Sequence, residues 1–246
     1  MQIKNWQWQD FALINSTNDV AIKNSPNYKE QQFIISAKMQ TNARGRLGRT
    51  WQSLDGNLFA SLGFPLDRIP LNILPFLLSL SLLKTIKELN PNINIILKWP
   101  NDVLINGKKI SGILLETTDH HIIAGIGVNI KNSPQNKLIS YPATNLKACD
   151  IKIDKYDFLQ LYIKKLDKFI HIFQQSGFQK IRTEWLKNTV NTGNPIKANL
   201  PKITLEGTFA GIDTDGALLL QQTNQITKIY AGDIFYEFDK DDNSNG

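Results

Sequence analysis

The dipeptide Asn106-Gly107 lies between two apolar runs, and it constrains the fold of this chain more than any other local feature. Both central residues of a two-residue type I′ turn need a positive φ, which asparagine and glycine tolerate best. The sequence therefore predicts a β-hairpin with strands at residues 102–105 and 108–116. The turn also fixes which residues of the two strands lie opposite each other.

The register of this hairpin places a carboxylate and an ammonium on one face. The expected facing pairs are Ile105 with Lys108, Leu104 with Lys109, and Asp102 with Ser111. The other face is then largely apolar and carries Val103, Ile105, Ile110 and Gly112. Asp102 and Lys109 could form a plain exposed salt bridge. Alternatively, because Leu104 and Ile113 lie on the same face, this face of the hairpin is at least half covered by other parts of the protein.

Apolar and alternating segments predict a mixed domain around this hairpin. Further strands are expected at residues 33–39, 57–64, 93–99 and 121–130. Helices are expected from Asn15–Asp19 to about Asn24 (ended by Pro26), at 73–89, at 154–176, and from Gly177 to about Lys187. The predicted fold class is α+β, with a mixed, mostly antiparallel sheet flanked by helices.

From Gly193 onward the sequence pattern changes to that of short β-strands. They are expected at residues 195–198, 203–212, 217–220, 226–230 and 233–238, with a hairpin turn at Asp215-Gly216. This pattern predicts a small β-barrel, so the expected domains are 1–190 and 191–246, the second ending in a frayed polar tail at 239–246.

Residues 40–49, here called the arginine loop, contain Arg44, Arg46 and Arg49 together with Gly45 and Gly48. Guanidinium groups match phosphate and carboxylate geometry, and glycine lets a backbone approach a ligand closely. A flexible cationic loop that leaves a strand is suited to holding the phosphates of a nucleotide. Such a loop could equally bind nucleic acid, or it could be a solvated basic loop without a ligand.

Three other segments are candidate ligand contacts. Ser16 lies at the start of a helix. It either only caps the helix or also holds a polar group of a ligand with its hydroxyl. Gly125 and Gly127 lie on one strand face and leave space for a ligand or another backbone, with Asn129 following on that face. The long polar loop 131–144 is typical of a lid or of disorder.

Composition limits the class of protein. The 246 residues are 41% hydrophobic with a net charge of +6, which suits a globular chain with an anionic partner. Cys149 is the single cysteine, so no intramolecular disulfide forms and a reducing compartment is indicated. We expect a soluble, cytoplasmic protein, because the sequence shows neither a signal peptide nor a membrane-spanning run.

Several kinds of catalysis lack their motifs. Three poorly spaced histidines do not form a metal site, and no nucleophile elbow, P-loop or dinucleotide fingerprint occurs. An enzyme with this sequence would work by positioning charged ligands and stabilising developing charge. The residues suited to that role are Arg44, Arg46, Arg49, Asp102 and Lys109.

The chain resembles the biotin protein ligases, also called biotin–acetyl-CoA-carboxylase ligases. The resemblance is carried by Ser16-Thr17-Asn18, Gln40-Thr41, residues 44–49 with Trp51, residues 98–102, residues 109–113 and residues 125–129. Their order and spacing agree with the family over about residues 10–146, and the strand-rich end is similar to its SH3-like C-terminal domain. A single motif of this kind is weak evidence, whereas five in this order are specific when Gln40-Thr41 and residues 44–49 with Trp51 are counted as one.

The resemblance implies a class II synthetase-like catalytic domain and a two-step reaction. Biotin and ATP would give biotinyl-5′-AMP and pyrophosphate, with Mg²⁺ accompanying the nucleotide. A lysine of the biotin carboxyl carrier protein of acetyl-CoA carboxylase would then take the biotinyl group.

Residue roles are also implied by the resemblance. The catalytic residues would be Lys109 and Arg46. The biotin-binding residues would be Ser16, Thr17, Asn18, Gln40, Arg44, Gly45, Arg46, Lys109 and Gly112. The ATP-binding residues would be Arg46, Arg49, Trp51, Asn101, Asp102 and Asn129, with Asp102 helping to place Mg²⁺.

Two departures and two alternatives qualify this resemblance. Ala43 replaces a usual glycine and takes a positive φ only at a cost, so the arginine loop is expected to start differently or close more slowly. Some members of the family repress transcription through an N-terminal DNA-binding domain, whereas here fifteen residues precede Ser16, so we expect no DNA binding. A lipoate or octanoyl ligase would show consecutive glycines near the first ligand loop, and an RNA-binding module would show an aromatic-rich basic strand. Monomer and homodimer both remain open.

Overall fold

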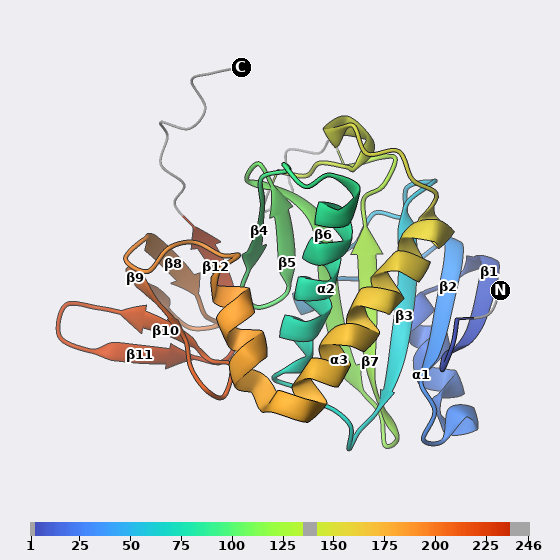
Figure 1. Ribbon diagram of the computed structural model, residues 1–246, viewed down its shortest axis with the longest axis horizontal. Coiled ribbons are helices and arrows are strands. Elements are labelled where there is room, and N and C mark those ends of the chain that lie inside the picture. Colours follow the sequence, from blue (N-terminus) through green and yellow to red (C-terminus); the bar gives the residue numbers. More distant parts are fainter. Residues whose placement is uncertain (1–2, 135–141, 237–246) are drawn as a thin grey trace.

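Two β-sheets and three α-helices form the part of the chain that the structure describes, residues 3–134 and 142–236 of a computed structural model (Figure 1). The loop at 135–141, within the expected lid, and the polar tail lie outside these described residues. The observed mixed sheet and helices confirm the predicted α+β class.

The large sheet has seven strands in the order β1-β2-β3-β7-β6-β5-β4. Their bounds are β1 Gln7–Ile14, β2 Phe33–Gln40, β3 Leu58–Pro65, β4 Ile95–Lys98, β5 Asp102–Ile105, β6 Lys108–Thr117 and β7 His121–Val128. The β1–β2 pair is parallel, and every other neighbouring pair is antiparallel. The edge strand β1 was not predicted, because its mixed sequence QWQDFALI leaves most of its side chains in solvent and gives no clear alternation.

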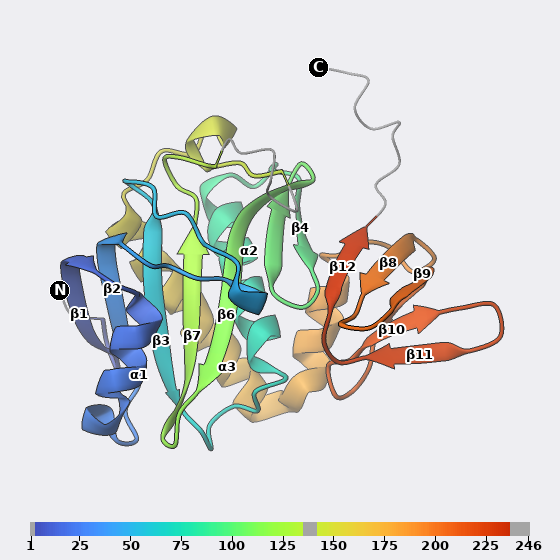
Figure 2. The ribbon, with the colours of Figure 1, turned by 180° about the vertical axis from the view of Figure 1, so that it is seen from behind.

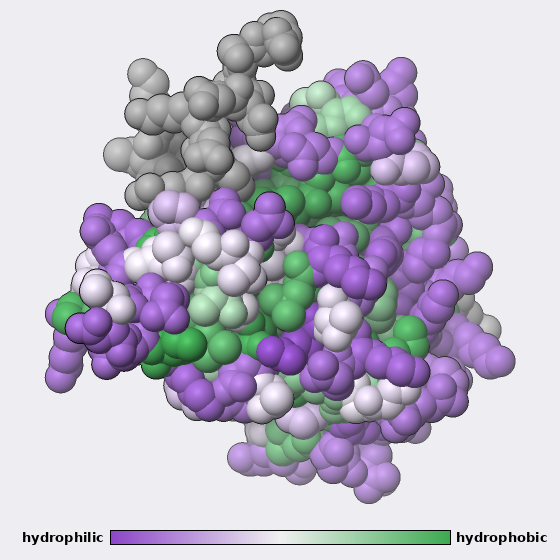
Figure 3. Space-filling view, turned by 60° about the vertical axis from the view of Figure 1, so that its left-hand side comes forward, coloured by the Kyte–Doolittle hydropathy of each residue, from purple (hydrophilic) through white to green (hydrophobic). Residues whose placement is uncertain are grey.

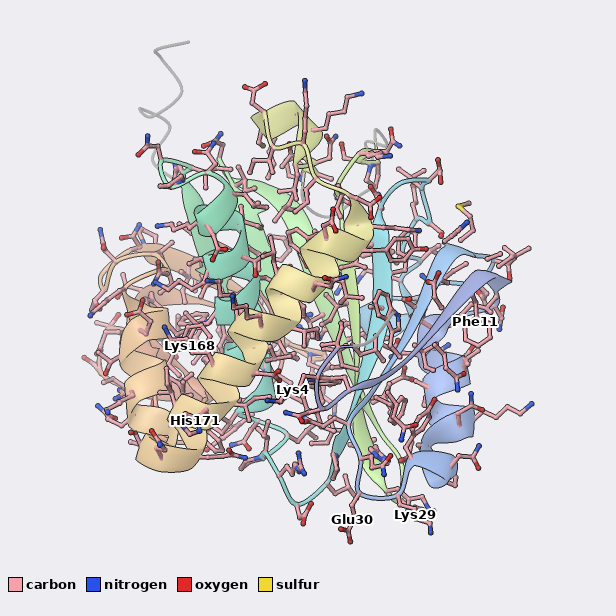
Figure 4. All side chains as sticks on the ribbon, turned by 45° about the vertical axis from the view of Figure 1, so that its right-hand side comes forward. Lys4, Phe11, Lys29, Glu30, Lys168 and His171 are labelled. Atoms are coloured by element: carbon pink, nitrogen blue, oxygen red, sulfur yellow. The ribbon has the colours of Figure 1, made fainter. Side chains whose placement is uncertain are left out.

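Helices cover both faces of this sheet (Figures 1 and 2). The helices α2 (Leu74–Leu89) and α3 (Lys155–Leu186) pack on each other and on one face, whereas α1 (Thr17–Tyr28) lies against β2, β3 and β7 on the other. The main hydrophobic core lies between the first face and the helices α2 and α3, and within it Phe76 packs edge-on against Trp185. Lys168 and His171 project from the outer side of α3, where charge is solvated (Figure 4).

Helix α1 extends beyond its predicted end. We expected Pro26 to terminate it, but Pro26 lies inside the helix, which ends at Tyr28. A proline removes one backbone donor, and the stacking of Tyr28 on Phe33 at 3.9 Å between ring centroids stabilises the last turn. The boundary predicted between two helices at Gly177 is a kink within α3, where Gly177 has a φ of 67°.

The hairpin of β5 and β6 confirms the predicted turn and corrects the predicted register. Asn106 and Gly107 have φ values of 48° and 70°. The first two facing pairs are as predicted, but Asp102 lies opposite Gly112 and not Ser111. A β-bulge at Ile110 adds one residue to β6, so Gly112 moves to the face of Asp102 and Lys109, and Ser111 to the opposite face.

The second sheet is antiparallel, with strand order β11-β10-β9-β8-β12. Its strands are β8 Pro195–Asn199, β9 Thr204–Ile212, β10 Leu218–Gln221, β11 Ile226–Ile229 and β12 Asp233–Tyr236. The turn before β10 docks on the large sheet, because Trp99 Nε1 donates to the Gly216 carbonyl at 3.1 Å and Asn72 Nδ2 donates to the Asp215 carbonyl at 2.7 Å. Figure 3 brings this sheet forward and shows a mostly hydrophilic surface with smaller apolar patches.

Candidate active site

A cavity of about 320 Å³ opens between the arginine loop, the start of α1, the β5–β6 hairpin, β7 and the start of β12. This volume lies within the range of small-molecule sites. Every site residue predicted from the sequence lines it: Ser16, Thr17, Asn18, Gln40, Arg44, Gly45, Arg46, Arg49, Trp51, Asn101, Asp102, Lys109, Gly112 and Asn129. The fold therefore brings together predicted site residues that are up to 113 residues apart in the chain, from Ser16 to Asn129.

Glycines on β6 and β7 form one wall of the cavity. A Cβ added at Gly127 would lie 2.5 Å from the Trp51 indole, and a Cβ added at Gly125 would overlap the amide of Asn18. At Gly112 it would lie 3.0 Å from the Trp51 ring. The space that these glycines leave is therefore filled by the protein's own side chains, which position Trp51 and Asn18 against the strands.

A buried polar cluster occupies the end of the cavity near α1. Gln40 Oε1 accepts hydrogen bonds from the backbone N–H of Thr17 at 2.8 Å and from Thr17 Oγ1 at 3.1 Å. Ser61 Oγ, which sequence reasoning missed, donates to Asn18 Oδ1 at 2.5 Å. Ser16 caps α1, since its Oγ accepts from the Asp19 N–H at 3.4 Å. Most polar atoms here thus have protein partners and fixed orientations.

Arg44 is held by two carboxylates that the sequence did not identify. Its Nη1 lies 2.5 Å from Asp19 Oδ1, and its Nη2 donates to Glu116 Oε1 at 3.0 Å. Glu116 Oε2 also accepts from Asn18 Nδ2 at 2.6 Å. Hydrogen bonds to Glu116 and then to Asp19 raise the pKa of Arg44. The guanidinium therefore ties the arginine loop to α1 and β6, and it is already neutralised by protein groups.

Asp102 lies between two ammonium groups. Lys109 Nζ is 2.6 Å from Asp102 Oδ1, and Lys98 Nζ is 3.4 Å from Oδ2. Burial opposes ionisation of Asp102, but the positive charges of Lys109 and Lys98 outweigh it and hold the carboxyl pKa below its usual value. Burial lowers the pKa of Lys98, although Asp102 partly offsets this. The cluster carries a net positive charge and favours an anionic ligand.

The other two arginines contact the C-terminal sheet. Arg46 donates from Nη1 to Asn101 Oδ1 at 3.1 Å and from Nη2 to the Gly232 carbonyl at 3.3 Å. Arg49 Nη2 lies 2.8 and 2.9 Å from the two carboxylate oxygens of Asp233. Asp233 was not among the predicted site residues, because an acidic residue at the start of a distant strand carries no local signal of contact with an arginine loop.

Ala43 avoids the positive φ that would be costly for an alanine. Its φ is not positive, its side chain is 6% exposed, and its carbonyl accepts from the Trp51 N–H at 3.0 Å. The positive φ values of the arginine loop fall instead at Leu47 (56°) and Gly48 (70°). Alanine is therefore accommodated at position 43 without steric cost.

Two asparagines of the predicted site support the backbone around the cavity. Asn101 Nδ2 donates to the Ile113 carbonyl at 2.5 Å, and Asn129 Nδ2 donates to the Thr144 carbonyl at 3.0 Å. Each amide therefore fixes the path of a neighbouring segment, which leaves its position well defined.

The donor set does not fit a magnesium ion held by the protein alone. Within residues 3–134 and 142–236, no three His, Cys, Asp or Glu side chains are grouped as metal ligands. The cavity carboxylates Asp102 and Asp233 are both engaged with cationic side chains. A magnesium ion that accompanies a nucleotide would have to take most of its ligands from phosphates and water.

The described helices include none that is long and apolar enough to cross a membrane.

Comparisons with known proteins identify the family of this chain. The model of the Biotin/lipoate A/B protein ligase family matches residues 11–129, and that of the biotin protein ligase C-terminal domain matches residues 192–236. The bifunctional ligase/repressor BirA of Bacillus subtilis is 32% identical over 233 residues, which are 90% of this chain and 71% of that protein. The biotin–[acetyl-CoA-carboxylase] ligase of Paracoccus denitrificans is 31% identical over 240 residues, or 92% of this chain and 98% of that protein.

A solved structure shares the fold over nearly the whole chain. The biotin protein ligase from Aquifex aeolicus in complex with biotin and ATP superposes with a TM-score of 0.83 at 28% identity, covering 96% of this chain and 99% of that one. Sequence and fold agree along both the large and the small sheet, and the chain belongs to the biotin protein ligase family.

Proposed function

We propose that this chain activates biotin with ATP and transfers the biotinyl group to a lysine of the biotin carboxyl carrier protein of acetyl-CoA carboxylase. In the first step a carboxylate oxygen of biotin attacks the α-phosphorus of ATP, and the bond to the bridging oxygen breaks to release pyrophosphate. In the second step the neutral lysine amine attacks the carbonyl carbon of biotinyl-5′-AMP. AMP leaves with the bonding electron pair, and the amine releases a proton.

The biotin end of the cavity is assigned to the polar cluster near α1. Ser16, Thr17, Asn18 and Gln40 present hydroxyl and amide groups that suit the donors and acceptors of a ureido ring. Gly112 lets the Trp51 ring and the Lys109 side chain pack closely against β6, and Gly45 also lines the cavity. Because Arg44 is already paired with Asp19 and Glu116, its assigned contact with biotin comes from its backbone or from its position in the loop.

The nucleotide end is assigned to the cationic side of the cavity. Arg46 and Arg49 offer guanidinium groups for phosphate oxygens, and Trp51 offers an aromatic face for the adenylate. Asn101, Asp102 and Asn129 line the same region. Asp102 acts mainly by orienting Lys109, because both of its oxygens face ammonium groups.

The placement of Lys109 is the observation that carries the proposed chemistry. Its ammonium lies in the cavity beside Asp102, and its Nζ lies 5.8 Å from the Trp51 ring centroid. A fixed positive charge at this place would stabilise the charge that develops as the carboxylate and the α-phosphate join. Arg46, anchored through Asn101, would act on the same phosphate.

The reaction is tested by biotin-dependent exchange of labelled pyrophosphate into ATP. Biotin and lipoate are offered separately, because the family model spans both kinds of ligase. We expect exchange with biotin, followed by transfer to a purified carrier protein. Exchange with lipoate alone would contradict the assignment and favour a lipoate ligase. Arg46→Ala should weaken the use of ATP in the same assay.

We further propose a cytoplasmic enzyme without a transcriptional role. In support, two basic side chains on α2 and α3 are paired with acidic ones, Lys84 with Glu184 and Lys165 with Glu88, so part of the positive charge on these helices is neutralised locally. Tight, salt-sensitive binding to a specific duplex would contradict this proposal.

A further inference from the structure

Asp233 is an acidic residue inside a cavity that is otherwise suited to anions. It begins β12 on the C-terminal sheet and lines the cavity together with Lys98, Arg46 and Arg49. Its side chain is 26% exposed, so it is accessible to a ligand yet partly shielded from bulk water. A nucleoside triphosphate entering this region would meet a carboxylate as well as the cations.

The carboxylate of Asp233 forms an ion pair with the guanidinium of Arg49. Both of its oxygens lie within 2.9 Å of Arg49 Nη2. The neighbouring carbonyl of Gly232 accepts from Arg46 Nη2 at 3.3 Å. One short turn of the C-terminal sheet therefore engages both arginines that the proposed function assigns to phosphates.

A carboxylate and a phosphate bind the donor edge of a guanidinium with the same geometry. The Arg49 Nη2 donor that faces Asp233 can therefore not serve a phosphate oxygen in the same way at the same time. We propose that Asp233 is an internal anion that competes with the phosphates of the nucleotide for Arg49 and so sets the affinity of the site for ATP. This inference rests on the proposed function, since it assumes that Arg49 meets phosphate.

The proposed competition predicts the direction in which ATP affinity changes when Asp233 is neutralised. An exposed arginine–carboxylate pair contributes little to stability, so its loss costs the fold little. Removing the negative charge frees Arg49 and removes a repulsion, so ATP should bind more tightly. A residue that merely held Arg49 in position would give the opposite result, because its loss would make ATP bind more weakly.

The test uses the full chain with Asp233→Asn, which keeps the size of the side chain. Calorimetric titration with ATP, and separately with inorganic pyrophosphate, at fixed ionic strength should show affinity raised about two- to fivefold, the size of one exposed ion pair. Titration with biotin should be unchanged. Asp233→Glu, which keeps the charge, should remain closer to the wild type than Asp233→Asn. Asp233→Ala, which also removes the charge, provides the same comparison if Asp233→Asn fails to fold.

Asp213→Asn is the matched control. Asp213 directly follows β9 of the same sheet and pairs with Lys228, outside the cavity. Its neutralisation changes the net charge equally and should leave ATP affinity unchanged. In an Arg49→Ala background, Asp233→Asn should lose most of its effect, because the contested guanidinium is gone.

Equal or weaker binding of ATP and pyrophosphate by Asp233→Asn would overturn the proposal. The failure of the proposed function is a separate result: the wild-type chain would show no biotin-dependent pyrophosphate exchange, whereas the calorimetric comparison of the variants would still report whether Asp233 competes for the anion.

Discussion

Lys109 Nζ lies 2.6 Å from Asp102 Oδ1 on the cavity side of the β5–β6 hairpin, although the two residues are not opposite each other in the sheet. The bulge at Ile110 shifts the register between them. Without that extra residue Gly112 would leave this face, and a serine side chain would stand next to Lys109. The bulge thus keeps a small residue beside the ammonium and next to the Trp51 ring.

Lys109→Ala should abolish most adenylate formation and leave the fold intact. Loss of the only charge that the proposal places between carboxylate and α-phosphate should lower the rate of pyrophosphate exchange by about 10²-fold or more. Buried Asp102 would lose its nearer ammonium partner but keep Lys98, so the free energy of unfolding should fall by about 1–3 kcal/mol and the chain should still fold. Lys108→Ala, at the exposed end of the same strand, is the control and should keep wild-type exchange. Wild-type turnover in Lys109→Ala would remove Lys109 from the mechanism.

Asp102→Asn should change how the free energy of unfolding depends on pH. The pKa of Asp102 is lower in the folded state than its ordinary value of about 3.9. Its carboxylate therefore contributes stability that is fully present above that ordinary value and is lost as pH falls through the lower, folded-state pKa. Thermal unfolding from pH 7 to pH 2 should show a steeper loss below about pH 4 in the wild type than in the variant. Parallel curves would show that Asp102 is not responsible.

Glu116→Ala should weaken biotin binding more than ATP binding. It removes the acceptor of both Arg44 and Asn18, which orient the arginine loop and the polar cluster. Loss of these two contacts should raise the KM for biotin by about five- to thirtyfold, and Glu116→Gln, which keeps an acceptor for Asn18, should have a smaller effect. Glu206→Ala removes an exposed carboxylate that pairs with Lys197 on the C-terminal sheet, and it serves as the control. Equal changes in both KM values would indicate general loosening of the site.

Gly112→Val should block the cavity. Even a single added Cβ would lie 3.0 Å from the Trp51 ring and 3.1 Å from Lys109 Cε, and valine adds two further methyl groups. We expect pyrophosphate exchange to fall by about 10²-fold, because small displacements of catalytic groups are costly. Far-ultraviolet circular dichroism checks that the sheet is retained. A folded Gly112→Val variant that turns over normally would show that this wall is not part of the reacting site.

Local chemistry in the sequence determined the turn at Asn106-Gly107, the cap at Ser16 and the helix break at Gly177, because each depends on the φ preferences or hydrogen bonds of neighbouring residues. The sequence also identified the lining segments from the catalytic half of the chain, since the order of the motifs carried the family resemblance, but it did not identify the start of β12. The roles assigned to those residues remain predictions.

Only the tertiary structure decided how the charges are arranged. Asp19, Glu116 and Asp233 look in the sequence like ordinary surface acids, and each meets its arginine through the fold, across as many as 184 residues for Arg49 and Asp233. The bulge at Ile110 and the edge strand β1 likewise depend on neighbouring strands and not on local propensity. Long-range pairing has no local energetic signature, which is why the sequence located the cavity but not the carboxylates that hold its arginines.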